Sequence, residues 1–169
     1  MDRVGRGLRQ RARIALKEPM TGPAFGFLLM ARPPGRGAAV EVANGRLERG
    51  IWPLYEWTRN RDALVPGVRI AIYVGGRAQI IATAVVQEVV TPGRRGIQVD
   101  PPEFVTPPAS RVLRLSRIVK LARPVQLRLL LPRLEMCPRN LQKWGSILSG
   151  GDCAVSKNDW RVLFGRPKP

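Results

Sequence analysis

Histidine is absent from this 169-residue chain, and its absence excludes several kinds of chemistry. Without histidine the chain can form neither a Ser-His-Asp or Cys-His nucleophilic centre nor a histidine-bearing zinc site. The two cysteines, Cys137 and Cys153, lack Cys-x-x-Cys spacing, so we expect no structural zinc site and two reduced thiols. The acidic residues are scattered singly, without an evident carboxylate pair or metal cluster. We therefore predict no catalytic activity, no metal and no cofactor.

Long apolar runs and targeting segments are missing as well. No run reaches the roughly 18 residues that a membrane span needs. No apolar segment follows the charges at the start of the chain, so no secretory signal is apparent. These absences favour a cytoplasmic protein without a membrane partner. The hydrophobic share of 44% is enough for one packed core, which predicts a single globular domain.

Positive charge is what the chain has in excess. The 29 Lys and Arg residues outnumber the 12 Asp and Glu residues, which gives a net charge of +17. Most of the basic residues are arginines, whose guanidinium groups bind phosphates and base edges. A chain this basic is expected to bind a polyanion, and nucleic acid is the first candidate.

The positive charge is concentrated at the N-terminus, where residues 1–17 hold six basic side chains against Asp2 alone. We interpret residues 1–22 as a basic arm, which is either a solvated tail or an electrostatic tether for phosphates. Residues 23–165 form the predicted domain, and residues 166–169 are a short C-terminal tail.

Hydrophobic patterning in the domain predicts mainly strands. Continuous or alternating apolar residues indicate strands at 25–30, 68–74, 78–90, 111–121 and just before the last helix. Gly75-Gly76 predicts a hairpin turn, and residues 91–109 a proline-rich loop. A short extended piece is predicted at 40–42, a helical turn at 60–64, a short helix at 125–131, and a last helix capped by Ser156. This pattern favours an α+β, mainly β fold: a small, partly closed barrel with short peripheral helices.

The segment 52–61 is the densest cluster of binding-type residues. Trp52, Tyr55 and Trp57 supply flat aromatic faces, and hydrogen-bond donors follow them at Thr58, Arg59, Asn60 and Arg61. A nucleobase site needs an aromatic face for stacking and hydrogen bonds to the base edge. The alternative interpretation is that Trp52 and Trp57 anchor a loop in the core.

Three stretches resemble one known family. The first is the end of the first predicted strand, Leu29-Met30-Ala31-Arg32. The second is Gly50-Ile51-Trp52-Pro53-Leu54-Tyr55 with Thr58-Arg59-Asn60-Arg61, followed by Val65-Pro66-Gly67 leading into residues 68–74. The third joins Asn140-Leu141-Gln142-Lys143-Trp144-Gly145, Gly150-Gly151 and Val155-Ser156-Lys157-Asn158-Asp159-Trp160. In this order they are similar to EVE domains, which are PUA-like barrels related to the YTH readers of methylated adenine. The resemblance covers about residues 25–164 and implies a PUA-like, antiparallel or mixed barrel.

What the resemblance implies about function is recognition of a flipped, modified base by an aromatic cage. Trp52 matches the cage wall, which we expect to be partly solvent-exposed, and Ala31 and Arg32 would lie along the base edge. The expected base pocket comprises Trp52, Tyr55, Trp57, Arg32, Ala31, Thr58, Asn60 and Trp144. The expected phosphate and backbone contacts are Arg59, Arg61, Ser146, Ser149, Arg36 and Lys143. Trp144 is equally consistent with packing and with contact to the base. For Trp160 packing in the core is favoured, and for the two serines turn capping is the commoner role.

The identity of the base is open at this stage. Arg32-Pro33-Pro34 stands where YTH readers have small polar residues, and Pro53 replaces a serine, which argues against adenine. The EVE resemblance then favours a modified cytosine in DNA, such as 5-methylcytosine, in a prokaryotic, restriction-associated protein with an associated nuclease. The alternatives are a YTH-like reader of N6-methyladenine or of structured RNA, and an ASCH-like amidohydrolase acting on modified nucleosides.

Overall fold

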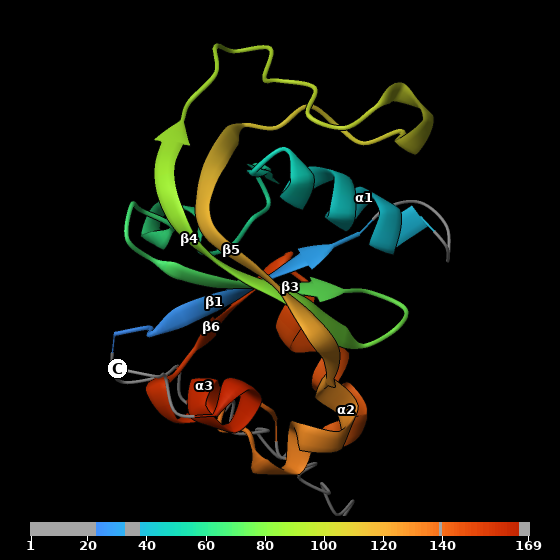
Figure 1. The fold of residues 1–169 in the computed structure, drawn as a ribbon, viewed down its shortest axis with the longest axis vertical. Helices are drawn as coiled ribbons and strands as arrows, with labels where there is room; N and C mark the ends of the chain where they lie inside the picture. Colours follow the sequence, from blue (N-terminus) through green and yellow to red (C-terminus); the bar gives the residue numbers. More distant parts are fainter. Residues whose placement is uncertain (1–22, 33–37, 139, 166–169) are drawn as a thin grey trace, which may run out of the picture.

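A computed structural model describes residues 23–32, 38–138 and 140–165 of the chain (Figure 1). The predicted basic arm, Arg36 and the C-terminal tail therefore lie outside the described residues. Six strands in the described part form one sheet in the order β2-β5-β4-β3-β1-β6. Their bounds are β1 (Gly26–Ala31), β2 (Ile51–Leu54), β3 (Arg69–Val74), β4 (Gln79–Val90), β5 (Arg111–Gln126) and β6 (Asp152–Val155). Strands β1 and β3 are parallel and the other neighbours antiparallel.

The β3–β4 hairpin forms the centre of the sheet, as the alternation of apolar residues predicts. In β4, Ile80, Ala82, Ala84 and Val86 are buried while the residues between them are partly exposed. Gly76 turns the chain with a φ of +82°, a conformation that glycine adopts without steric cost. The predicted hairpin is therefore confirmed.

Strand β5 runs further than its apolar pattern predicts. Its backbone stays paired with β4 as far as Gln126, which lies opposite Gln79. The helix predicted at 125–131 is consequently shorter, and α2 covers only Leu127–Leu130 before a 3-10 turn at Leu131–Arg133. Pairing with a neighbouring strand, which local sequence does not reveal, decides where β5 ends.

Helix α1 (Ala38–Glu48) replaces the extended piece predicted at 40–42, so that prediction is wrong. The buried residues of the helix, Ala39, Val42, Ala43, Arg46 and Leu47, are three or four positions apart and lie on one face. That face packs on the sheet. The helix thereby reaches β2, β1 and β3, three strands that are distant in sequence.

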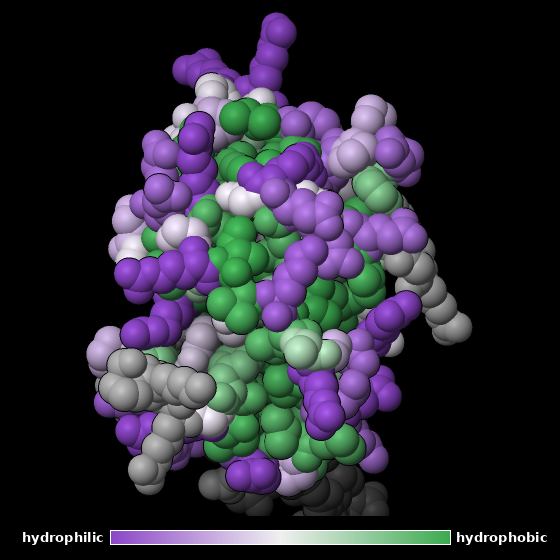
Figure 2. All heavy atoms as spheres, viewed as in Figure 1, coloured by the Kyte–Doolittle hydropathy of each residue, from purple (hydrophilic) through white to green (hydrophobic). Residues whose placement is uncertain are grey.

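The sheet separates two apolar clusters because alternate residues of a strand point to opposite faces. In β1, Phe27 and Leu29 join α1 in one cluster, whereas Leu28 joins the C-terminal elements in the other. Those elements are α2, the 3-10 helix η4 (Leu141–Leu148) and α3 (Lys157–Phe164). On the face shown in Figure 2, apolar side chains gather along the middle and hydrophilic ones project around them.

The last strand, β6, and the last helix, α3, follow the prediction. The Ser156 hydroxyl accepts a hydrogen bond from the Asp159 N–H at 3.1 Å and caps α3. Trp160 is buried against Phe25, with ring centroids 5.9 Å apart, which confirms its place in the core. Neither Cys137 nor Cys153 is part of a disulfide among the described residues.

The curved six-stranded sheet and its short helices form a half-barrel, so the predicted mainly β, α+β fold with a partly closed barrel is confirmed. The sheet is mixed rather than purely antiparallel, because β1 runs parallel to β3. Among the described helices, none is long and apolar enough to cross a membrane.

Candidate nucleic-acid interface

A cavity of about 310 Å³ lies where β1, β2 and the turn after β2 meet. We call it the aromatic cavity; its lining is Leu29, Met30, Arg32, Arg46, Trp52, Pro53, Leu54, Tyr55, Trp57, Thr58, Pro107 and Gly151. Small-ligand sites typically have volumes of about 300–1,000 Å³, so this cavity has room for one small planar group. Five of the predicted pocket residues line it: Trp52, Tyr55, Trp57, Arg32 and Thr58.

Trp52 contributes to the wall of this cavity from inside the core. Its side chain is only 2% exposed and packs in the apolar cluster beneath α1. The Arg46 guanidinium lies 5.1 Å from the ring centroid in a cation–π contact. The expected partly exposed ring is therefore wrong. β2 pairs with β5 so that Trp52 lies opposite Leu113, and both side chains belong to the apolar cluster beneath α1.

Trp57 and Tyr55 form the aromatic surface that a ligand can reach. Their rings are stacked, with centroids 4.7 Å apart and planes within 9° of each other. Trp57 is 59% exposed, whereas Tyr55 is partly buried beside it. An exposed indole that is already held by a stacked neighbour loses little freedom when a further ring binds.

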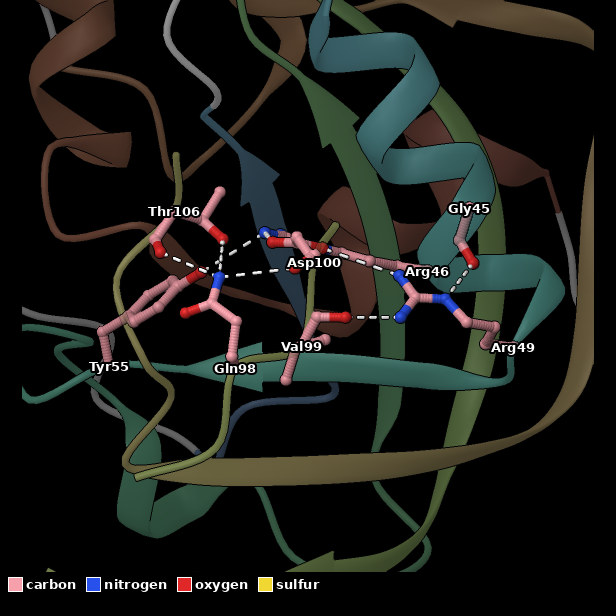
Figure 3. Close-up of polar contacts among 8 residues, drawn as sticks. All are labelled: Gly45, Arg46, Arg49, Tyr55, Gln98, Val99, Asp100 and Thr106. Atoms are coloured by element: carbon pink, nitrogen blue, oxygen red, sulfur yellow. Dashed lines mark hydrogen bonds and ion pairs between the residues drawn. The ribbon is translucent and has the colours of Figure 1, made fainter. Parts of the chain in front are cut away.

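A buried ion pair holds Tyr55 in place (Figure 3). Arg46 of α1 donates two hydrogen bonds to the Asp100 carboxylate, one of them 2.7 Å long. The same guanidinium donates to the Tyr55 hydroxyl at 3.3 Å. Arg49, in the turn after α1, also donates to the carbonyl of Val99. Together these contacts fasten the long β4–β5 loop to α1 and to the tyrosine of the cavity.

The electrostatics of this cluster depend on its burial. Burial by itself raises the pKa of Asp100, but hydrogen bonds and charge from Arg46 outweigh that effect and hold the pKa below its ordinary value. Burial raises the pKa of Tyr55, with Arg46 opposing the rise, so the tyrosine hydroxyl stays protonated at neutral pH. The cluster is thus a carboxylate neutralised by arginine next to a neutral phenol.

The turn after β2 is held from both sides. The Thr58 hydroxyl accepts the Tyr55 N–H at 3.0 Å, and the buried Asp152 carboxylate accepts the Arg59 N–H at 2.9 Å and the Asn60 N–H at 3.2 Å. Thr58 therefore lines the cavity while it also closes its own turn. Asn60 is fixed through its backbone and does not line the cavity.

A second cavity, of about 590 Å³, lies next to the first. We call it the hairpin cavity; its lining is Met30, Ala31, Arg32, Ala39, Tyr73, Gly75, Gly76, Ala78, Arg128, Trp144 and Gly145. Met30 and Arg32 line both cavities. The predicted pocket residues Ala31 and Trp144 lie here and not in the aromatic cavity, so the structure divides the predicted pocket in two.

The predicted phosphate contacts differ in how free their side chains are. Arg59 donates to the Ser149 hydroxyl at 3.3 Å, and Ser146 donates to the Lys143 carbonyl at 2.7 Å. Arg61 is paired with Glu56, and its hydrogen bond and charge lower the pKa of that carboxyl. Arg59, Ser149 and Lys143 are exposed, whereas Arg61 is already engaged.

Sequence reasoning missed the residues that position the site. Arg46 falls in a segment expected to be a glycine-containing connection, and Asp100 falls in a proline-rich loop. Nothing in the local sequence distinguishes Asp152 from other carboxylates at strand ends, and its role depends on the turn at 58–60 that packs against it. The helical spacing of apolar residues in 38–48 was the one available signal, and it would have placed Arg46 on the buried face of α1.

Among the described residues, no carboxylate and no thiol lines either cavity. Within the described ranges, no three His, Cys, Asp or Glu side chains come together as metal ligands would. The arrangement offers aromatic faces, arginine donors and backbone, which are means of binding.

Comparison with known proteins finds likeness only among solved structures, since no family model and no curated protein matches the chain. One is the N-terminal domain of Staphylothermus marinus McrB, with a TM-score of 0.47, 11% identity, and coverage of 86% of this chain and 96% of that domain. Another is the YTH domain-containing protein mmi1 in complex with RNA, with a TM-score of 0.40, 10% identity, and coverage of 82% and 76%.

Proposed function

We propose that this domain binds nucleic acid and receives one flipped base in the aromatic cavity, without altering it chemically. The observation that carries the proposal is the exposed Trp57 ring at a base-sized cavity, stacked on Tyr55 and accompanied by Arg32. Aromatic faces bind any base by stacking, and an arginine supplies hydrogen bonds to base edges or phosphate. The net charge of +17 favours a polyanionic partner.

The energetics require contacts beyond the cavity. Flipping a base out of a duplex costs a few kcal/mol, and stacking on an aromatic side chain returns about 1–3 kcal/mol. Phosphate contacts must therefore supply most of the affinity. Exposed arginines around the cavities can make them, because Arg59, Arg77 and Arg128 have no carboxylate partner among the described residues.

For the base itself we propose a modified cytosine in DNA, such as 5-methylcytosine. The resemblance of residues 50–61 to EVE domains and the modest size of the cavity support this choice. One buried methyl group contributes about 0.8 kcal/mol, which is about a fourfold change in affinity. Discrimination against plain cytosine is therefore expected to be modest unless the cavity also rejects the plain base.

The test is a binding panel at fixed salt concentration. Matched oligonucleotides carry cytosine or 5-methylcytosine in DNA, and adenine or N6-methyladenine in RNA. The expected result is tightest binding to the DNA with 5-methylcytosine. Equal binding to modified and plain DNA would refute the proposal, and a preference for N6-methyladenine would establish the RNA alternative. Incubation with modified nucleosides, followed by product analysis, tests the amidohydrolase alternative.

Trp57→Ala localises the binding to the aromatic cavity. Loss of one stacking face should cost about 1–3 kcal/mol with the modified oligonucleotide, and nearly as much with the plain one, because stacking holds either base. Because Trp57 is 59% exposed, the melting temperature should stay close to that of the wild type. The matched control is Val119→Ala, which removes a side chain that is 55% exposed and lines neither cavity. An equal effect of both substitutions would place the base elsewhere.

A further inference from the structure

The hairpin cavity combines features that the aromatic cavity does not use. It lies on the other side of Met30 and Arg32, where the β3–β4 turn, α2 and η4 approach one another. Its volume of about 590 Å³ is nearly twice that of the aromatic cavity.

One wall of the hairpin cavity is aromatic. Trp144 is half-buried in η4 and meets Tyr73 of β3 edge to face, with ring centroids 6.3 Å apart. The Arg128 guanidinium lies 5.9 Å from the centre of the Trp144 ring. Tyr73 is 3% exposed, and its hydroxyl makes no hydrogen bond within the described ranges. Indole, guanidinium and phenol surfaces of this kind stack on a planar ring and hydrogen-bond to its edge.

The charge of the hairpin cavity is positive and uncompensated. Arg32 and Arg128 line it, and neither forms an ion pair with a described carboxylate. By contrast, Arg46, Arg61 and Arg111 elsewhere in the structure are each paired with an acid. No acidic residue lines the cavity. An anionic ligand is therefore favoured there, and arginine is the residue best suited to phosphate.

We propose that the hairpin cavity binds a nucleotide, with its base against Trp144 and Tyr73 and its phosphate on Arg128 or Arg32. The inference rests on the proposed function in one respect: the nucleotide is the neighbour of the flipped base in the same strand. Met30 and Arg32 line both cavities, so the C-terminal end of β1 separates the two sites. A free mononucleotide has the same chemistry and is the other source of such a ligand.

Gly145 offers a way to close the site without touching its binding groups. The residue lines the hairpin cavity, and an added Cβ would meet nothing within 4 Å. Its φ is not positive, so Gly145→Leu is not strained and should extend into open space. Gly93→Leu is the matched control, because Gly93 is equally open but lines neither cavity. Thermal melts check that both variants fold, and Arg128→Gln, at an exposed position, is a second variant that removes only the cation.

The first experiment measures oligonucleotide affinity with and without a base on either side of the modified one. Replacing the flanking nucleotide by an abasic site should weaken wild-type binding at least about fivefold, the loss of one stacked base. Gly145→Leu should bind the intact oligonucleotide as weakly as the wild type binds the abasic one. Gly93→Leu should behave as the wild type, and Trp57→Ala should keep its sensitivity to the flanking base.

The second experiment titrates the protein with deoxycytidine monophosphate and, separately, with deoxycytidine. The nucleotide site is supported if the monophosphate binds, deoxycytidine does not, and both Gly145→Leu and Arg128→Gln abolish the binding. If abasic flanks have no effect in the first experiment, the ligand is a free mononucleotide. The inference is overturned if neither the flanking base nor the mononucleotide responds to these two variants. A further outcome is that Gly145→Leu and Arg128→Gln still weaken binding although modified and plain oligonucleotides bind equally. In that case the proposed recognition of a modified base fails and the nucleotide site stands.

Discussion

The buried Arg46–Asp100 pair allows a direct test of how the aromatic cavity is held in shape. Asp100→Asn removes the negative charge at nearly constant size and leaves the Arg46 guanidinium without its counter-charge. Removing one partner of a buried pair typically costs about 3–5 kcal/mol of folding free energy. The two side chains are 3% and 1% exposed, so solvent screens the lost interaction little. For a domain of this size the melting temperature should fall by roughly 6–20 °C.

The control is a pair of the same charge type on the surface. Arg114 and Glu88 lie 3.4 Å apart, and both side chains are more than half exposed. Glu88→Gln should therefore cost less than about 1 kcal/mol. Urea denaturation of both variants gives the comparison. If Asp100→Asn is no more destabilising than Glu88→Gln, the pair does not support the fold and our reasoning is refuted.

The double variant Arg46→Met/Asp100→Leu separates charge from packing. Replacing a whole buried ion pair by apolar residues is often neutral or stabilising, because no charge is left uncompensated. The double variant should therefore be more stable than Asp100→Asn. If it is equally unstable, the shape of the loop contact and not the orphaned charge determines the loss.

Acid titration of stability supplies an independent readout of the same pair. The folded pKa of Asp100 lies below its ordinary value, because Arg46 outweighs the effect of burial. Its contribution is therefore present above the unfolded aspartate pKa of about 3.9 and is lost as the pH falls through the folded pKa. The stability difference between the wild type and Asp100→Asn should be constant near neutral pH and shrink in acid. A difference that persists at the lowest pH would assign the effect to something other than this titration.

Three further predictions follow from burial and charge. Trp52→Ala should cost about 3–5 kcal/mol of stability, because the ring is 2% exposed, and urea denaturation measures the loss; a variant that melts like the wild type would return Trp52 to the cavity surface. Burial raises the pKa of Cys153 to about 12, so the native thiol should resist iodoacetamide at pH 8 until urea unfolds the protein; rapid alkylation of the folded protein would contradict this. Deletion of residues 1–17 should flatten the dependence of log affinity on log salt concentration and leave the modified-to-plain ratio unchanged; a collapse of that ratio would show that the arm contacts bases.

Local patterns in the sequence were sufficient where one short stretch contains the whole interaction. The β3–β4 hairpin follows from alternating apolar residues on either side of Gly75-Gly76, and the start of α3 follows from a serine three residues before the N–H that it accepts. The excess of arginine likewise predicts a positively charged surface, and the absence of histidine limits the available chemistry; neither inference requires knowledge of the fold. The adjacency of Trp52, Tyr55 and Trp57 drew attention to a segment that lines the aromatic cavity, and two of these three rings are partly or largely exposed.

The tertiary structure decided what depends on partners far away in the chain. Pairing of β2 with β5 buries Trp52, and packing against β4 extends β5 to Gln126. Arg46 meets Asp100 across 54 positions, and Asp152 meets the 58–60 turn across more than 90. The tertiary structure also divides the predicted pocket into two cavities on either side of Met30 and Arg32. A buried charge or a cavity wall is stabilised by the sum of such distant contacts, so its position becomes defined only when the chain has folded.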